Sequence, residues 1–168
     1  MKVIFSHGKE SGPWGTKIRA LAAVAKTAGC MVESVDFRHT NDPDQRVRHL
    51  LDTVFPGDTL ILVGSSMGGY VATLAAKTLR PRGLFLMAPA FYLPGYIEQD
   101  PDPQNIPTVV VHGLWDEVVP LENALRFARR HNSALHLLPA GHSLVEQMPA
   151  VERLFAGFLQ DVRPFTSE

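Results

Sequence analysis

A buried apolar run that turns directly into a helix is the feature that most constrains this sequence. The unbroken apolar run 60–63 predicts a strand buried on both faces, and apolar residues from Val71 onward recur at helical spacing. Between them lies Gly64-Ser-Ser-Met-Gly68, a G-x-S-x-G pattern. Such a tight reversal needs glycines and places the Ser66 hydroxyl at a helix N-terminus, where free N–H groups favour negative charge. An ordinary Ser/Gly turn is the alternative, but the flanking strand and helix favour a nucleophilic serine, with Ser65 as its inert neighbour.

Short apolar runs alternate with amphipathic helical patterns along the rest of the chain. Strands are predicted at residues 3–5, 31–37, 60–63, 83–87, 108–111 and 135–138. Helices are predicted at residues 16–28, from Asp42-Pro43 to before Pro56, from Gly68 to Arg80, at 121–130 and at 144–159. This alternation predicts a three-layer α/β/α sandwich, in which helices cover both faces of a mainly parallel six-stranded sheet.

Length and composition limit the function classes that this chain can serve. Its 168 residues, 45% of them hydrophobic, predict one domain over residues 1–168. A net charge of −1 with interspersed signs argues against nucleic-acid and anionic-membrane surfaces. Neither a signal-peptide core nor a spanning apolar run is present, so we expect a cytoplasmic location. Cys30 is the only cysteine, and no His, Cys and Asp set has metal-site spacing, so we expect no metal and no cofactor.

Two loops that follow predicted strands carry suitable partners for Ser66. The carboxyl ends of parallel strands share the edge of the sheet that holds ligand sites. Asp116 follows the fifth predicted strand, and His142 follows the sixth. An imidazole can take the serine proton, and a carboxylate can fix the imidazole tautomer. The alternatives are a turn aspartate with Glu117 as the acid, and an ordinary loop histidine, but the order Ser, Asp, His favours a triad.

These motifs resemble the landmarks of the α/β-hydrolase superfamily over nearly the whole chain. The landmarks are Gly64-Ser-Ser-Met-Gly68, His112-Gly-x-x-Asp116 with its Val-Val-Pro tail, Gly141-His142, and His7-Gly8 after the first strand. The chain is most similar to small, lidless bacterial esterases of the YqiA type. The resemblance implies Ser66 as nucleophile, His142 as general base and acid, and Asp116 as the acid that orients it. It also implies an oxyanion hole formed by the backbone N–H groups of Met67 and Lys9.

Lys9 departs from the superfamily pattern, in which an apolar or aromatic residue usually follows His-Gly. A backbone N–H donor does not depend on its side chain, so the oxyanion hole is expected to survive. The side chains of Lys9 and Glu10 either contact a polar substrate or form an exposed pair.

A short connection between the fourth and fifth predicted strands indicates an open site. Only about twenty residues separate Met87 from Thr108, which is too few for a sizeable helical lid, so the fold is expected to lack a substantial cap. Eight apolar residues in loops at this edge are candidates for a shallow substrate pocket, although core positions are the alternative for some of them: Trp14, Phe91, Tyr92, Leu93, Tyr96, Leu114, Trp115 and Leu144.

The sequence therefore predicts a metal-free serine hydrolase that cleaves carboxylic esters through an acyl-enzyme on Ser66. Thioesters and activated amides use the same machinery. Two alternatives stay open: a catalytically weak binding protein that keeps the fold, and a lyase or perhydrolase that uses the same triad. The expected partner is a small-molecule ester or thioester, with neither nucleic acid nor a membrane.

Overall fold

A six-stranded, all-parallel β-sheet forms the centre of the molecule, which a computed structural model describes for residues 1–57 and 59–163. The strands are β1 (Lys2–Ser6), β2 (Met31–Val35), β3 (Leu60–Ser65), β4 (Gly83–Met87), β5 (Thr108–Gly113) and β6 (Ala134–Leu138). They follow the order β2-β1-β3-β4-β5-β6 across the sheet, and every neighbouring pair is parallel. The central strands β3 and β4 are buried along their whole length, which explains their continuous apolar sequences.

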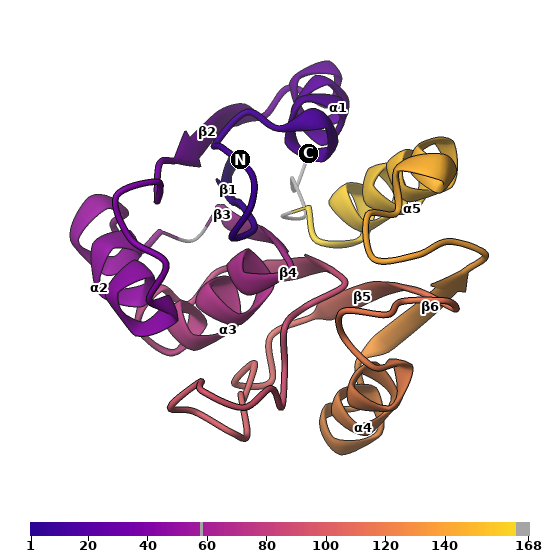
Figure 1. Ribbon diagram of the computed structural model, residues 1–168. Helices are drawn as coiled ribbons and strands as arrows, with labels where there is room; N and C mark the ends of the chain where they lie inside the picture. Colours follow the sequence, from indigo (N-terminus) through magenta and orange to yellow (C-terminus); the bar gives the residue numbers. More distant parts are fainter. Residues whose placement is uncertain (58, 164–168) are drawn as a thin grey trace.

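Helices cover both faces of the sheet (Figure 1). One face carries α1 (Thr16–Thr27) and α5 (Met148–Asp161), and the other carries α2 (Pro43–Thr53), α3 (Met67–Leu79) and α4 (Leu121–His131). Because strand side chains alternate between faces, Phe5 of β1 belongs to the first core and its neighbour Ile4 to the second. Within the described ranges, no helix combines the length and the apolar character needed to span a membrane.

The predicted three-layer α/β/α architecture with a parallel six-stranded sheet is confirmed, and several element boundaries differ by a few residues. The closing helix, predicted from residue 144, begins at Met148 after a short 3-10 helix, η1 (Val145–Gln147). Leu144 cannot belong to it because its φ of 58° is incompatible with a right-handed helix. Strand β2 ends at Val35, two residues earlier than predicted.

The connection between β4 and β5 contains no helix or strand and forms no cap. Residues 88–107 are instead bonded to the helices beside them. Asn123 at the start of α4 donates from its side chain to the carbonyl of Phe91 (2.8 Å). The backbone N–H of Glu98 donates to the hydroxyl of Tyr70 in α3 (3.1 Å). The chain above the carboxyl ends of the strands is therefore short and anchored.

Candidate active site

Ser66 occupies a strained turn between β3 and α3. Its backbone has a positive φ (φ 54°, ψ −121°), which a non-glycine residue adopts only when its surroundings hold it there. Backbone hydrogen bonds hold the turn in place. Ser66 N donates to the carbonyl of Met87 (2.9 Å), and Ser66 O accepts from the N–H groups of Gly69 (2.8 Å) and Ala90 (3.0 Å). The turn is thus fixed from both β4 and α3.

The glycines around this turn are needed because backbones approach closely. A Cβ on Gly64 would collide with the backbone of the first turn of α3, and a Cβ on Gly68 would collide with the backbone of Ser6 in β1. Gly8 brings the loop after β1 against the turn, since a Cβ there would lie 3.6 Å from the Cβ of Ser66. Glycine therefore lets the loop after β1 reach the serine.

A hydrogen-bonded chain joins the three residues that the sequence predicted as a triad. The Ser66 Oγ lies 3.0 Å from Nε2 of His142, and Nδ1 of the same ring lies 2.8 Å from Oδ2 of Asp116. An ionised carboxylate can only accept, so the imidazole proton is on Nδ1 and Nε2 is free to accept from the serine hydroxyl. The geometry is that of a nucleophile, its base and an orienting acid.

Asp116 is an ionised carboxylate held by three donors. Burial alone would raise the pKa of Asp116, but the hydrogen bonds from His142 and from the backbone N–H groups of Val118 and Val119 outweigh burial and lower it. Both backbone N–H groups donate to Oδ1, at 2.9 Å and 2.8 Å. The side chain of the next residue, Glu117, is exposed. Asp116, and not Glu117, is therefore the acid in contact with His142.

A second histidine, His112, supports the carboxylate from the end of β5. Its fully buried ring places Nε2 3.0 Å from the carbonyl of Val119 and 3.3 Å from Oδ2 of Asp116. Because both neighbours are acceptors, Nε2 carries the proton; it donates to the Val119 carbonyl, and the Asp116 carboxylate lies beside the same N–H. Burial lowers the pKa of His112, which keeps the ring neutral. His112 thus holds the loop between β5 and α4 without adding a positive charge.

The loop after β1 is held by two side chains that converge on one carbonyl. His7 Nδ1 donates to the carbonyl oxygen of Gly8 (2.7 Å), and Nε2 of the same ring accepts from the N–H of Phe37 (3.0 Å). Nη1 of the buried Arg46 donates to the same Gly8 oxygen (3.2 Å). The Gly8 carbonyl and the Lys9 N–H belong to one planar peptide unit, so fixing the first also fixes the second. In the described part of the chain, nothing accepts from the Lys9 N–H.

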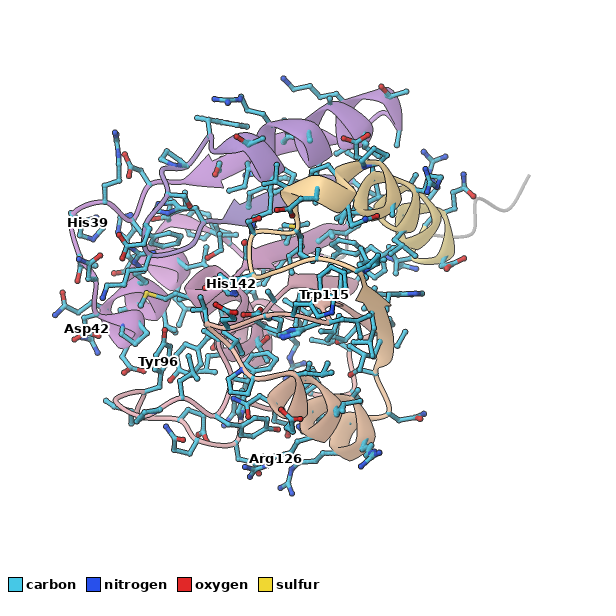
Figure 2. The ribbon with its side chains drawn as sticks, turned by 45° about the vertical axis from the view of Figure 1, so that its right-hand side comes forward. His39, Asp42, Tyr96, Trp115, Arg126 and His142 are labelled. Atoms are coloured by element: carbon cyan, nitrogen blue, oxygen red, sulfur yellow. The ribbon has the colours of Figure 1, made fainter. Side chains whose placement is uncertain are left out.

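A cavity of about 370 Å³ opens beside the serine. It is lined by residues of the turn at Ser66, of the loop after β1 and of the segment 88–107. The lining residues include Lys17, Leu93, Tyr96, Val118, Val119 and His142. Figure 2 shows His142 near the centre of the molecule and Tyr96 below it, and both residues line the cavity. Lys9, Met67 and Glu10 also line it, so the residues of both predicted backbone donors border the cavity.

Most of the predicted pocket residues lie elsewhere. Of the eight candidates only Leu93 and Tyr96 line the cavity. Phe91 is fully buried and stacks on Phe127 with ring centroids 4.3 Å apart, and Leu144 is fully buried in the core under α5. Tyr92 lies under the guanidinium of Arg126. The remaining three side chains are exposed and line no cavity next to Ser66: Trp14, Leu114 and Trp115.

Two polar residues near the site, Arg46 and Lys17, were not predicted from the sequence. A faint signal exists for Arg46, because it lies four residues before Leu50 on the buried face of α2. No signal exists for Lys17 other than its place shortly after the His7-Gly8 loop. Within residues 1–57 and 59–163, no group of three or more His, Cys, Asp or Glu side chains is arranged to hold a metal ion.

The sequence matches the model of the uncharacterised protein family UPF0227 over residues 2–108. No curated protein matches the chain. A crystal structure from Xanthomonas campestris pv. campestris, of a protein assigned to the hydrolases of the alpha/beta superfamily, shares 31% sequence identity. The two structures superpose with a TM-score of 0.87 over 95% of this chain and 98% of that chain.

Two further structures share the fold at lower sequence identity. Est1E from Butyrivibrio proteoclasticus is 19% identical and has a TM-score of 0.86 over 96% of this chain and 87% of that chain. A Xanthomonas campestris protein described as an a/b serine hydrolase without lid is 21% identical, with a TM-score of 0.79 over 99% of this chain and 84% of that chain. The missing cap of the present structure thus has a parallel among similar folds.

Proposed function

Because the chain belongs to the uncharacterised protein family UPF0227 and to the α/β-hydrolase superfamily, we propose that it is a serine hydrolase that cleaves carboxylic esters. One observation carries the proposal: the unbroken hydrogen-bonded chain from Ser66 through His142 to Asp116. A strained serine at a helix N-terminus, bonded to a correctly polarised imidazole, is arranged for nucleophilic attack on a carbonyl carbon.

In the acylation step, His142 Nε2 takes the proton of Ser66 as Oγ attacks the ester carbonyl carbon. The carbonyl oxygen becomes negative, and we assign the N–H groups of Met67 and Lys9 as its donors. The imidazolium is stabilised by the buried carboxylate of Asp116 and then protonates the leaving alkoxide. The products of this step are the free alcohol and an acyl ester on Ser66.

In the deacylation step, the neutral imidazole of His142 takes a proton from a water molecule, which attacks the acyl carbonyl. The same two N–H groups receive the second oxyanion. Collapse returns the proton to Ser66 Oγ and releases the carboxylic acid. The same steps would cleave a thioester, because the leaving group is then a thiolate instead of an alkoxide and the other groups keep their roles.

Active-site titration with a fluorophosphonate tests this proposal. We expect the reagent to label Ser66 stoichiometrically and to abolish hydrolysis of p-nitrophenyl butyrate. Ser66→Ala should lose labelling and about 10⁴-fold or more in kcat, because the members of a triad act as a unit. Ser65→Ala is the matched control, since Ser65 is adjacent but makes no bond to His142, and it should keep much of both. Labelling that persists in Ser66→Ala would refute the assignment.

A further inference from the structure

Lys17 brings an unpaired positive charge to the cavity beside Ser66. It lies in the first turn of α1 and lines the same cavity as Ser66 and His142. The side chain is partly buried. In the described part of the chain, no carboxylate lies within ion-pair distance of the Lys17 ammonium, and no acceptor is hydrogen-bonded to it. A lysine at the start of a helix is also disfavoured by the helix dipole, so its position has no explanation in helix stability.

The charged groups around this cavity do not neutralise Lys17. Asp116 acts on it only from a distance, since the two charged groups are not within ion-pair distance, and both carboxylate oxygens already accept hydrogen bonds from His142 and from backbone N–H groups. Lys9 and Glu10 also line the cavity, carry opposite charges and are exposed to solvent. The remaining titratable groups of the lining are the imidazole of His142, which is neutral when it acts as a base, and the phenol of Tyr96, whose pKa is raised by burial. The cavity therefore keeps one cation in excess.

Burial lowers the pKa of Lys17 to about 8, and the charge of Asp116 partly opposes this shift. A group with that pKa is still mostly protonated at pH 7. An ammonium that is partly removed from water without a partner is unfavourable, and an anion bound beside it would relieve that cost. The lysine is thus charged under ordinary conditions and available to a ligand.

A second cavity of about 100 Å³ adjoins the first at Lys17. Three residues line both cavities: Ser11, Lys17 and Ser65. The smaller cavity is also lined by Thr16 and Ser143, and most of its wall is apolar. A space of this size suits a small group. The nucleophile and the lysine therefore bound one continuous site with a short side branch.

From this arrangement we infer that the substrate ester carries a free carboxylate, which binds to the ammonium of Lys17 while the ester carbonyl lies at Ser66. The inference rests on the proposed esterase function and adds a substrate class to it: monoesters of dicarboxylic acids, or esters of an alcohol that bears a carboxylate. A single ammonium without an ion-pair partner matches a monoanion in charge.

Matched ester pairs test this inference. Mono-p-nitrophenyl esters of fumarate, adipate and suberate would be compared with the same esters capped as methyl esters, so that only the charge of the distal group differs. The acetate ester of p-hydroxybenzoate and its methyl ester form the pair with the carboxylate in the leaving group. In at least one pair, kcat/KM of the wild-type protein should be about ten- to a hundredfold higher for the anionic member, the range expected for a hydrogen bond to a charged group.

Three variants assign that preference to Lys17. Lys17→Met should bring the ratio of the two kcat/KM values to about one or below, and Lys17→Arg should retain a preference because it retains the charge. Lys26→Met on the exposed surface of the same helix is the matched control and should keep the wild-type ratio. The wild-type ratio should also fall as pH rises through about 8, because the ammonium is then lost. The ratio of Lys17→Met should not change with pH in this range.

The outcomes separate this inference from the proposed function. If the wild-type protein cleaves the capped esters as well as or better than every anionic partner, the carboxylate inference is overturned while the esterase proposal stands. The carboxylate inference is also overturned if the Lys17→Met variant, shown by circular dichroism to be folded, keeps the preference for the anionic esters. If the fluorophosphonate does not label Ser66 and no ester is cleaved, the esterase proposal fails and the inference fails with it.

Discussion

Arg46 in α2 donates a hydrogen bond of 3.2 Å to the carbonyl of Gly8, a residue 38 positions away in the sequence. The guanidinium is fully buried, and its other bonds also go to carbonyl oxygens, those of Thr40 (2.9 Å) and His7 (3.3 Å). Its charge is therefore directed at the loop after β1. That loop presents the Lys9 N–H, which we assign to the oxyanion hole.

We therefore predict that Arg46→Met lowers kcat for p-nitrophenyl butyrate by about ten- to a hundredfold while KM changes little. The reason is that a misplaced donor weakens transition-state stabilisation more than ground-state binding. Steady-state kinetics on folded protein would measure this. Arg48→Met, on the exposed side of the same helix, should behave as wild type. A rise in KM at constant kcat would contradict a role in positioning the donor.

The side chain of Asp116 is buried against His142, whereas that of its neighbour Glu117 is exposed, so variants of the two residues should differ sharply in kcat. Asp116→Asn should lose orders of magnitude in kcat, because an amide can favour the wrong imidazole tautomer. Glu117→Gln should stay within a few-fold of wild type, as expected of an exposed charge. Kinetics of both purified variants would decide the matter. If Glu117→Gln proved the more damaging change, the acid of the triad would have to be Glu117.

Buried neutral histidines should make the protein less stable in acid. Burial lowers the pKa values of His7 and His112 below the usual 6.5. Below pH 6.5 the unfolded chain therefore binds protons that the folded chain does not, and the free energy of unfolding falls as pH decreases. Each ring contributes at most about 1.4 kcal/mol per pH unit. Urea denaturation between pH 7.5 and about 5 would measure the slope.

His112→Gln keeps a side-chain donor but cannot titrate, so the pH slope of its unfolding free energy should be smaller than that of wild type. His39→Gln, which changes an exposed imidazole, serves as the control and should keep the wild-type slope. Equal slopes in wild type and His112→Gln would rule out a contribution from this ring.

Chelating agents should leave esterase activity unchanged, because the proposed steps use only Ser66, His142, Asp116 and backbone N–H groups. Activity of protein dialysed against EDTA would be compared with activity after addition of Zn²⁺ or Mg²⁺. Loss of activity in EDTA with recovery on addition of one of these ions would mean that the metal-free mechanism is incorrect.

The sequence was sufficient to place the turn at Ser66 and the loops that carry Asp116 and His142, because a parallel sheet restricts where the loops after its strands can lie. A loop that follows a parallel strand must lie at the same edge as the other such loops, so Asp116 and His142 could be assigned to the edge that holds Ser66. Local motifs and strand order carry that information, and neither requires knowledge of side-chain packing.

The lining of the cavity could not be obtained in this way, because it depends on which way each loop side chain points. Phe91 follows strand β4 at the edge that holds Ser66, but its ring stacks on Phe127 in α4 and does not line the cavity. Trp115 directly precedes Asp116 yet is 66% exposed. The burial of Arg46 and the partial burial of Lys17 are also tertiary effects, because helical spacing alone does not show that a charged side chain points inward.

The anchored segment between β4 and β5 determines how the rate of hydrolysis would differ between dissolved and micellar substrate. Residues 88–107 are bonded to α3 and α4 and do not form a flap over Ser66. A hydrolase without a flap over its active site needs no lipid–water interface to open that site. Its rate should follow the concentration of dissolved substrate monomers and level off where micelles begin to form, and progress curves should start without a lag.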